Sequence, residues 1–374
     1  MAQALSRRAD MAEQNIHEKH NLSEEQRILK HFAARFFSTE CPLGKVKESI
    51  EADQPYSREL WMKMAEQGYL GLLLPERSGG LALGLIELAI ISEEMGKACL
   101  PGPFISNLWG SCAIERASTA TQRGGILAEI VKGATTLTVA LLQQKGEETP
   151  ASAELNARMN GDGYLFNGES IHVMDGEHAD HVLMTAKNPG RQSVLAVIPL
   201  DSPGFTLTRV PGLDHMRPCY LVSCSNVPVA KEQLLAVGNS ADSAMAYATS
   251  VATLAATAEM VGTIQWILEA VMKFTGIRVQ MGQVIEAFKD ISSRCADLIA
   301  AVENCRSAVY SAATALEQGE AGAVDAVSLA RTLTAETSDE LGSLLLQRQE
   351  GMGLTWEHDI HLFRGAPPFF NSIS

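Results

Sequence analysis

The amino-acid sequence predicts an α+β fold in which helices, then strands, then helices follow one another along a single chain. Apolar residues recur with helical spacing in the first third, alternate with a period of two between about 135 and 229, and return to helical spacing after about 239. Segregated helices and strands favour α+β layers over an alternating βαβ order. A chain of 374 residues is long enough for about two to three domains. We place the boundaries at 1–134, 135–236 and 237–374.

The region 1–134 is predicted to be a helical bundle. Ser23 and Gln26 have the spacing of a capping box, and an apolar helical stripe begins at Ile28. Ser57 marks a second helix start. Another helix follows the proline and glycine residues of segment 75–80, because these residues interrupt the apolar pattern.

The region 135–236 is predicted to hold short strands in a small antiparallel barrel or sandwich. Thr136–Leu142 is β-branched and apolar, and two further strands, His181–Thr185 and Ser193–Ile198, flank the turn residues Asn188–Gly190. Asn167–Gly168 is predicted to form another tight turn.

The region 237–374 is predicted to be helical. The alanine-rich segment Ser243–Gly262 contains Glu259, so we expect a packed helix there and not a bilayer span. An apolar stripe runs from Ile285 to Val302, and a long helix is predicted from about 323 to 349.

Charge and cysteine content exclude several classes of function. The formal net charge is −14 and no Lys/Arg-rich run is present, so we expect no nucleic-acid partner and no membrane insertion. The seven cysteines form no C-x-x-C pair, which predicts neither a disulfide framework nor a cysteine zinc site. The first residues lack an apolar signal segment, and we expect a cytoplasmic protein.

Common catalytic motifs are not recognisable in the sequence. P-loop, G-x-G-x-x-G, H-E-x-x-H and G-x-S-x-G patterns do not occur. His358 and His361 are three residues apart, but they are flanked by acidic residues and have no third ligand in view, so we predict no metal site.

Two C-terminal segments contain candidate binding residues. Arg278 and Gln280 precede a glycine between two helical runs, where a guanidinium can hold a diphosphate and an amide a further oxygen. An exposed arginine in a helix–helix turn is the alternative. Gln347 and Gly351 lie in a glycine-containing segment after a long helix, which either lets a ligand approach the backbone or ends the helix.

These segments resemble the acyl-CoA dehydrogenase family. Residues 274–288 match Y-x-x-x-R-x-Q-F-G-x-P-I-x-x-F, and residues 347–358 match Q-x-x-G-G-x-G-F-T-x-E-H. Segments 22–27, 75–84, 87–103 and 162–169 resemble four earlier family motifs in the right order. The resemblance implies N-terminal helices, a central antiparallel β-domain and a C-terminal four-helix bundle. The T-W-E-H form of the last motif is similar to a bacterial subgroup that often combines two unlike subunits, including enzymes for steroid or bile-acid side chains.

The resemblance also implies a cofactor, partners and residue roles. In the family, FAD lies across a subunit contact, a carboxylate takes the α-proton of an acyl-CoA thioester, and the flavin accepts the hydride from Cβ. It assigns Arg278 and Gln280 to the FAD diphosphate region and Gln347 and Gly351 to the adenosine side, as groups given to the neighbouring subunit's cofactor. The implied partners are an acyl-CoA substrate, a homologous dehydrogenase subunit in a homo- or heterotetramer, and an electron-accepting flavoprotein.

Several positions depart from the family pattern. The L-T-E-P-x-x-G-S-D segment is replaced by Leu141–Glu148, and the flavin-facing F-I-T-N-G segment by His172–Gly176, which puts Met174 where a hydroxyl is expected. The family's C-terminal base motif, Y-E-G-T, has no equivalent in Gly365–Ser374. An alternative base position, one helix earlier, falls at about Ala252.

Two interpretations follow from the resemblance and the departures. The first is a partner subunit that lacks its own base and contributes FAD contacts to a catalytic subunit. The alternative is a self-sufficient homo-oligomeric dehydrogenase with an unrecognised base such as Glu259; no catalytic residue is assigned in either case. The acyl group is expected to be a steroid or bile-acid side chain, with a branched or medium-length fatty acyl-CoA as the alternative. Nucleic-acid binding on this fold conflicts with the net charge of −14.

Overall fold

The computed structural model describes residues 22–117, 120–140, 155–210, 216–277, 279–280, 283–284 and 289–348. These residues belong to two compact units, each of which gathers segments from distant parts of the chain. Unit 1 takes its described residues from 1–45, 85–100 and 253–370, and unit 2 takes them from 46–84 and 101–252.

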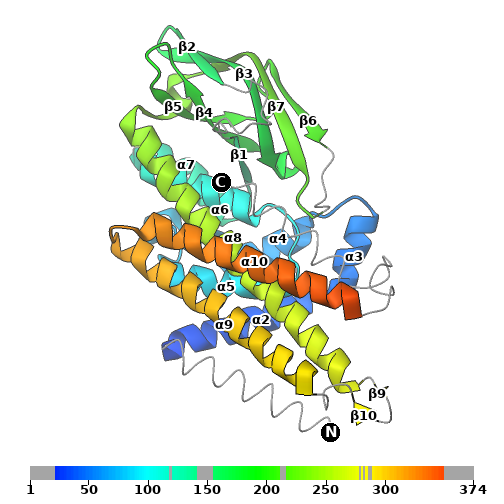
Figure 1. Cartoon of the computed structure of the whole chain (residues 1–374). Helices are drawn as coiled ribbons and strands as arrows, with labels where there is room; N and C mark the ends of the chain where they lie inside the picture. Colours follow the sequence, from blue (N-terminus) through cyan, green and yellow to red (C-terminus); the bar gives the residue numbers. More distant parts are fainter. Residues whose placement is uncertain are drawn as a thin grey trace. The chain divides into compact units, whose positions relative to one another are not determined.

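Unit 1 is helical. Helix α2 (Glu24–Glu40) packs on α5 (Leu85–Lys97), α5 packs on α9 (Lys289–Gln318), and α9 lies beside α10 (Ala323–Arg348) (Figure 1). The part of α8 (Asn239–Ile277) that follows residue 252 also belongs to this unit.

The predicted capping box at the start of α2 is confirmed. The Gln26 amide N–H donates to Ser23 Oγ at 3.2 Å, and the Ser23 amide N–H donates to Gln26 Oε1 at 2.9 Å. These two bonds satisfy backbone donors that the first helical turn leaves without partners.

Two glycines allow α5 and α8 to approach closely. A Cβ atom added at Gly96 of α5 would lie 1.8 Å from the carbonyl oxygen of Glu259, and one added at Gly262 of α8 would lie 1.9 Å from that of Glu93. Each glycine therefore contacts the backbone of the opposite helix, and neither position has room for a side chain.

Unit 2 begins with helices and continues into a sheet. The helical elements before its sheet are α4 (Arg58–Glu66), η1 (Tyr69–Gly71), η2 (Glu76–Ser78), α6 (Phe104–Ala117) and α7 (Ala120–Val131), and α3 (Leu43–Glu51) spans the boundary with unit 1. The short helices η3 (Gly176–His178) and η4 (Lys231–Gln233) and the part of α8 up to residue 252 also belong to unit 2. Ser57 caps α4, as predicted, by accepting a hydrogen bond from the Leu60 amide N–H at 3.3 Å.

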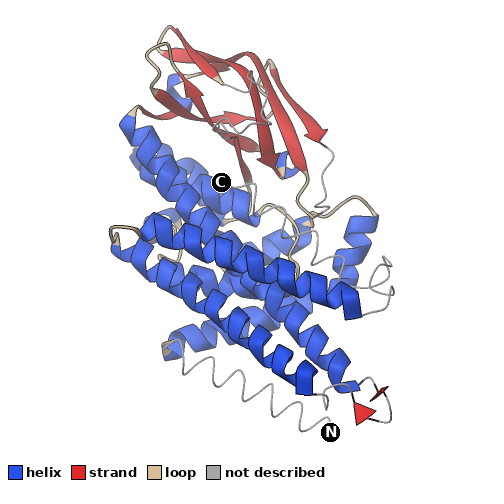
Figure 2. Cartoon of the chain, in the orientation of Figure 1, coloured by secondary structure: helices blue, strands red, loops and turns tan. Residues whose placement is uncertain are grey.

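The sheet of unit 2 is formed by eight strands, which Figure 2 shows grouped together. Seven of them follow the order β6-β7-β3-β2-β4-β5-β8, and β1 pairs with β4 outside that path. The strands are β1 (Leu137–Ala140), β2 (Asn156–Asn160), β3 (Gly163–Met174), β4 (His181–Lys187), β5 (Ser193–Pro199), β6 (Phe205–Val210), β7 (Cys219–Val229) and β8 (Leu234–Val237).

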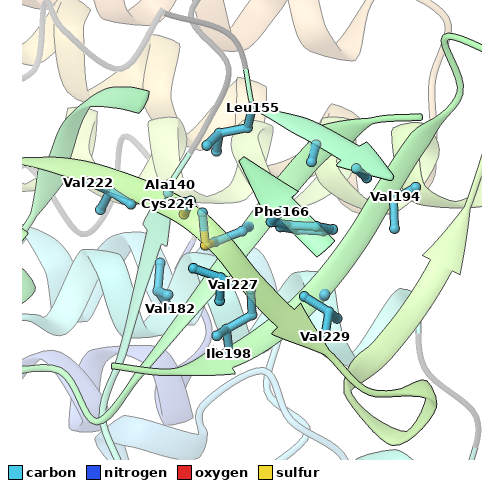
Figure 3. Close-up of a cluster of buried hydrophobic side chains, with 14 of the residues drawn as sticks. Ala140, Leu155, Phe166, Val182, Val194, Ile198, Val222, Cys224, Val227 and Val229 are labelled. Atoms are coloured by element: carbon cyan, nitrogen blue, oxygen red, sulfur yellow. The ribbon is translucent and has the colours of Figure 1, made fainter. Parts of the chain in front are cut away.

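An apolar cluster on one face of this sheet forms part of the core of unit 2. Alternate residues of the strands meet there, among them Phe166, Val182 and Val222, which are fully buried (Figure 3). Strands β6 and β7 show the alternation of more and less buried residues that a period of two predicts, whereas β4 and β5 are buried along most of their length.

The sheet differs from the prediction at two places. Strand β1 runs parallel to β4, with Leu137 opposite His181, so the sheet is not wholly antiparallel. Parallel neighbours need a long connection, and strands β2 and β3 lie between these two in the chain. Asn167–Gly168 lies inside β3 and makes no turn; the register with β7 shifts there, and Gly168 has φ 123°. The extra residue of this irregularity lies on β7: only Asn167 stands between Phe166 and Gly168, whereas Ser225 and Asn226 stand between their partners Val227 and Cys224.

The predicted α+β class is confirmed: helices come first in the chain, the strands of the sheet follow, and helices come last. Helix α8 contains a stretch, Asn239–Ala270, that is long and apolar enough to cross a membrane, but 89% of its most apolar window is buried inside the protein, as in a core helix. Two short strands, β9 (Val279–Gln280) and β10 (Gln283–Val284), follow α8. Of the predicted C-terminal four-helix bundle, the described residues hold α8, α9 and α10; residues after 348 are outside the described structure, and the three-domain division stays a prediction.

Candidate functional site

The end of β3 is the part of unit 2 that corresponds to the predicted flavin-facing segment. Met174 is the last residue of the strand, and its carbonyl oxygen accepts a hydrogen bond from the Thr138 hydroxyl on β1. The next residue, Asp175, donates its amide N–H to the Pro218 carbonyl at 3.0 Å. The backbone of this corner is thereby tied to two other segments of the same unit.

Asp175 is held in an uncommon backbone conformation. Its φ of 52° lies in the left-handed region, which aspartate tolerates better than most residues. Its side chain is buried, and Oδ2 accepts a 2.7 Å hydrogen bond from the Ser106 hydroxyl of α6. Helix α6 therefore supports the corner at the side chain, while the neighbouring strands support it through the backbone.

This corner does not fit the flavin-facing role that the family resemblance gives to it. The Met174 side chain is only 3% exposed and carries no hydroxyl. The Met174 carbonyl, the Asp175 amide and one Asp175 carboxylate oxygen are all bonded within unit 2. Each of these groups thus has a partner within unit 2, and the described residues of this corner present no side-chain hydroxyl at the position where the family pattern has one.

The histidine beside the corner has a packing role. His178 stacks on Tyr56, with ring centroids 4.9 Å apart and an interplanar angle of 27°. Its backbone carbonyl accepts a 2.6 Å hydrogen bond from the Thr136 hydroxyl. Burial lowers the pKa of His178, against the opposing effect of Glu177, which favours a neutral ring. Among the described residues, no group of three His, Cys, Asp or Glu side chains is arranged to hold a metal ion.

The two positions considered for a catalytic base both lie on α8. Ala252 is fully buried and presents only a methyl group, which can neither take nor give a proton. Glu259 is buried in unit 1, where its own carbonyl oxygen accepts a 3.1 Å hydrogen bond from the Thr263 hydroxyl. Neither position supplies a solvent-accessible carboxylate, and no catalytic residue is assigned.

A buried charge cluster in unit 1 centres on Glu93 of α5. Arg306 of α9 donates from Nε to the two carboxylate oxygens at 3.1 and 3.2 Å, and Lys30 of α2 lies 3.3 Å from Oε1. The Arg306 side chain is 1% exposed, and its Nη2 also donates to Gln265 at 2.9 Å. Burial alone would raise the pKa of Glu93, but Arg306, Lys30 and Lys97 hold it below its ordinary range.

This cluster was not recognised as such in the sequence. Glu93 falls in the segment that resembles a family motif, but nothing in the sequence pairs it with Arg306, 213 residues away. A charged residue inside an otherwise apolar helix is the signal that could have pointed to it, since such residues are rarely buried without a partner. The cluster joins α2, α5 and α9. Lys30, Glu93 and Arg306 are buried, so we assign the cluster a structural role.

The four predicted FAD contacts are only partly within the described structure. Gln280 lies in β9, opposite Gln283, and Gln347 lies near the end of α10, but their side chains are outside the description. Arg278 and Gly351 lie outside the described residues.

Two models of one protein family match the chain. The model described as "Acyl-CoA dehydrogenase, N-terminal domain" matches residues 23–134, and the one described as "Acyl-CoA dehydrogenase, C-terminal domain" matches residues 243–368. The matched ranges hold the helical regions on either side of the sheet strands.

Individual relatives agree with this match over nearly the full length. Acyl-CoA dehydrogenase IpdE2 of Mycolicibacterium smegmatis is 26% identical over 343 residues, which cover 91% of this chain and 92% of that protein. A variant of the Tcur3481–Tcur3483 steroid acyl-CoA dehydrogenase is 26% identical, with a TM-score of 0.81 and 93% of each chain covered.

A second solved structure shows the same fold. It is the ChsE4–ChsE5 complex of Mycobacterium tuberculosis, with a TM-score of 0.84 at 22% identity and coverage of 94% of this chain and 93% of that one. The matching models, the end-to-end relatives and the shared fold lead to one conclusion. The chain belongs to the acyl-CoA dehydrogenase family.

Proposed function

We propose that this chain is the non-catalytic subunit of a heteromeric acyl-CoA dehydrogenase, and that it contributes contacts to the FAD of a catalytic partner subunit. The observation that carries this proposal is the Met174–Asp175 corner. Its polar groups are bonded to Thr138, Pro218 and Ser106, and a buried thioether stands where the family places a hydroxyl.

The base positions support the same proposal. An acyl-CoA dehydrogenase needs a carboxylate that reaches the α-proton of its substrate. Ala252 has no acid–base group, and Glu259 is buried among the helices of unit 1. A subunit without a base has no need of a flavin site of its own, which accounts for both departures together.

The family motif residues that this sequence keeps are those that contact the FAD of the neighbouring subunit. Arg278 and Gln280 would face the diphosphate of the partner's FAD, and Gln347 and Gly351 its adenosine side. An arginine suits this task because its planar guanidinium can hold two phosphate oxygens at once. The FAD of the complex supplies the hydride-accepting chemistry, while this chain supplies binding.

A steroid or bile-acid side-chain acyl-CoA is the proposed substrate class of the complex. Its support is the likeness of the chain to the Tcur3481–Tcur3483 steroid acyl-CoA dehydrogenase, together with the T-W-E-H motif at residues 355–358. An electron-accepting flavoprotein as redox partner and a cytoplasmic location are part of the same proposal.

The flavin content of the complex tests the contributed contacts. The chain is expressed together with an acyl-CoA dehydrogenase homologue from the same organism, and the ratio of FAD to protein is measured from the visible spectrum. Arg278→Ala should lower FAD affinity by about ten- to a hundredfold, because one charge-assisted bond is lost. Arg331→Ala on α10 is the matched control and should leave the ratio unchanged. An unchanged ratio in Arg278→Ala would remove Arg278 from the cofactor site.

The self-sufficient homo-oligomeric enzyme is the alternative. It requires a base, and Glu259 is the candidate that the sequence offers. Glu259→Gln in the purified chain distinguishes the two: the alternative predicts loss of dye reduction with acyl-CoA, whereas our proposal predicts that the unmodified chain alone already has no such activity.

A further inference from the structure

Unit 2 contains a cavity that neither the family resemblance nor the proposed function uses. Its volume is about 360 Å³, which is at the lower end of the range of small-molecule sites. Helix α6 provides three of the lining side chains from one face, at spacings of three and four residues. The other walls come from the segment before Pro75 and from α8. The lining residues are Leu73, Leu74, Cys112, Glu115, Arg116 and Tyr247.

Two charged side chains, Glu115 and Arg116, line the cavity. Glu115 forms an ion pair with Arg77 of η2, which lies outside the lining, so its carboxylate is already neutralised. Arg116 is the guanidinium that lines the cavity, and its charge favours an anionic ligand.

Arg116 is held in place without a carboxylate. Its guanidinium carbon lies 3.8 Å from the centre of the Tyr247 ring, which is a cation–π contact. Within the part of the chain that the structure describes, Arg116 makes no ion pair. A ring face attracts the cation but does not replace a carboxylate as an acceptor for its five N–H groups.

The remaining wall of the cavity is apolar. Leu74 is buried and Leu73 is half-buried. Burial raises the pKa of Cys112 to about 12, so its side chain is a neutral thiol that behaves as a small apolar group. The lining therefore combines a cationic group with apolar side chains that suit a short hydrocarbon chain.

We propose that this cavity binds a small organic carboxylate with a short apolar chain. The carboxylate is held by the Arg116 guanidinium, and the chain lies against Leu73, Leu74 and Cys112. A cationic ligand is disfavoured by the Arg116 guanidinium. Inorganic phosphate would satisfy Arg116 but would leave the leucine wall unused.

Calorimetric titration of the full chain with three matched probes tests the ligand class. Hexanoate is the expected ligand, with a Kd of about 1 mM for so few contacts. Hexanamide has the same shape without the charge and should bind about tenfold more weakly. Hexylamine should not bind. No hexanoate binding up to about 20 mM, or tighter binding of hexylamine than of hexanoate, would overturn the proposal.

Substitution of Arg116 locates the binding site. Arg116 is exposed at the end of α6, so Arg116→Gln is expected to fold, which its thermal unfolding midpoint verifies. The variant should bind hexanoate about ten- to a hundredfold more weakly. Arg158→Gln, at an exposed position of β2, is the matched control and should bind as the unmodified chain does. Equal affinity in Arg116→Gln would show that hexanoate binds elsewhere and would contradict the proposal. Because the test needs neither FAD nor a partner subunit, its outcome is independent of the proposed function.

Discussion

The Ser106 hydroxyl donates a 2.7 Å hydrogen bond to the buried carboxylate of Asp175, and this bond joins α6 to the corner that ends β3. The two residues are 69 positions apart in the chain. The bond is charge-assisted when Asp175 is ionised, and such bonds are stronger than those between neutral groups.

Ser106→Ala should destabilise the protein by about 1–3 kcal/mol, because it removes a hydrogen bond from a buried carboxylate. Urea unfolding measures this difference. Ser38→Ala, at an exposed position of α2, is the control and should change the free energy of unfolding by less than about 0.5 kcal/mol. A loss for Ser106→Ala as small as that of the control would show that the bond contributes little to the corner.

Gly96→Ala should destabilise the protein by about 3 kcal/mol, because the added methyl group would lie 1.8 Å from the Glu259 carbonyl oxygen. Gly125→Ala in α7 is the matched control: nothing lies within 4 Å of the added Cβ, so alanine should stabilise the helix by about 0.5–1 kcal/mol. Thermal unfolding of both variants compares them. Equal midpoints would contradict the close contact of α5 and α8.

Arg306→Met should destabilise unit 1 by about 3–5 kcal/mol, because it leaves the Glu93 carboxylate buried without its principal cation. The double variant Glu93→Leu with Arg306→Met should be destabilised less than Arg306→Met alone, because it removes the carboxylate together with the guanidinium. Denaturant unfolding measures both. A double variant that is destabilised by the sum of the two single variants would show that the pair is not coupled.

The cluster also predicts how stability depends on pH. The pKa of Glu93 in the folded protein lies below its ordinary value of 4.5, so the folded state binds fewer protons than the unfolded state in this range. The stability that Glu93 contributes is therefore complete above about pH 4.5 and is lost as the pH falls below it.

Glu93→Gln isolates this contribution. The difference in free energy of unfolding between the unmodified chain and Glu93→Gln should decrease as the pH is lowered from about 6 to about 3. Urea unfolding at several pH values in that interval gives the difference. A difference that stays constant would mean that Glu93 is not ionised within the cluster.

Local signals in the sequence predicted much of the fold. The Ser23–Gln26 capping box and the Ser57 helix start were correct because both depend on residues within one turn of each other. The prediction of a turn at Asn167–Gly168 was wrong, because β3 continues through this pair to Met174 and pairs with β7 on both sides of it. The parallel pairing of β1 with β4 depends on contacts between distant segments, which no local pattern contains.

The candidate site was less predictable than the fold. The replacement of a hydroxyl by Met174 was visible in the sequence, but the closing bond from Ser106 to Asp175 was not. The pairing of Glu93 with Arg306 was equally hidden, because it joins two helices 213 residues apart. Such pairs form where helices and strands pack together. A single sequence shows both residues of a pair, but it does not show that they are in contact.

The visible absorption spectrum of the chain purified alone tests the central claim most directly. We expect a colourless protein that shows no flavin absorption and does not reduce a dye with acyl-CoA, and a yellow complex when a catalytic homologue is expressed with it. A yellow protein that is purified alone and reduces the dye with acyl-CoA would contradict the account, because the chain would then complete its own flavin site and supply its own base.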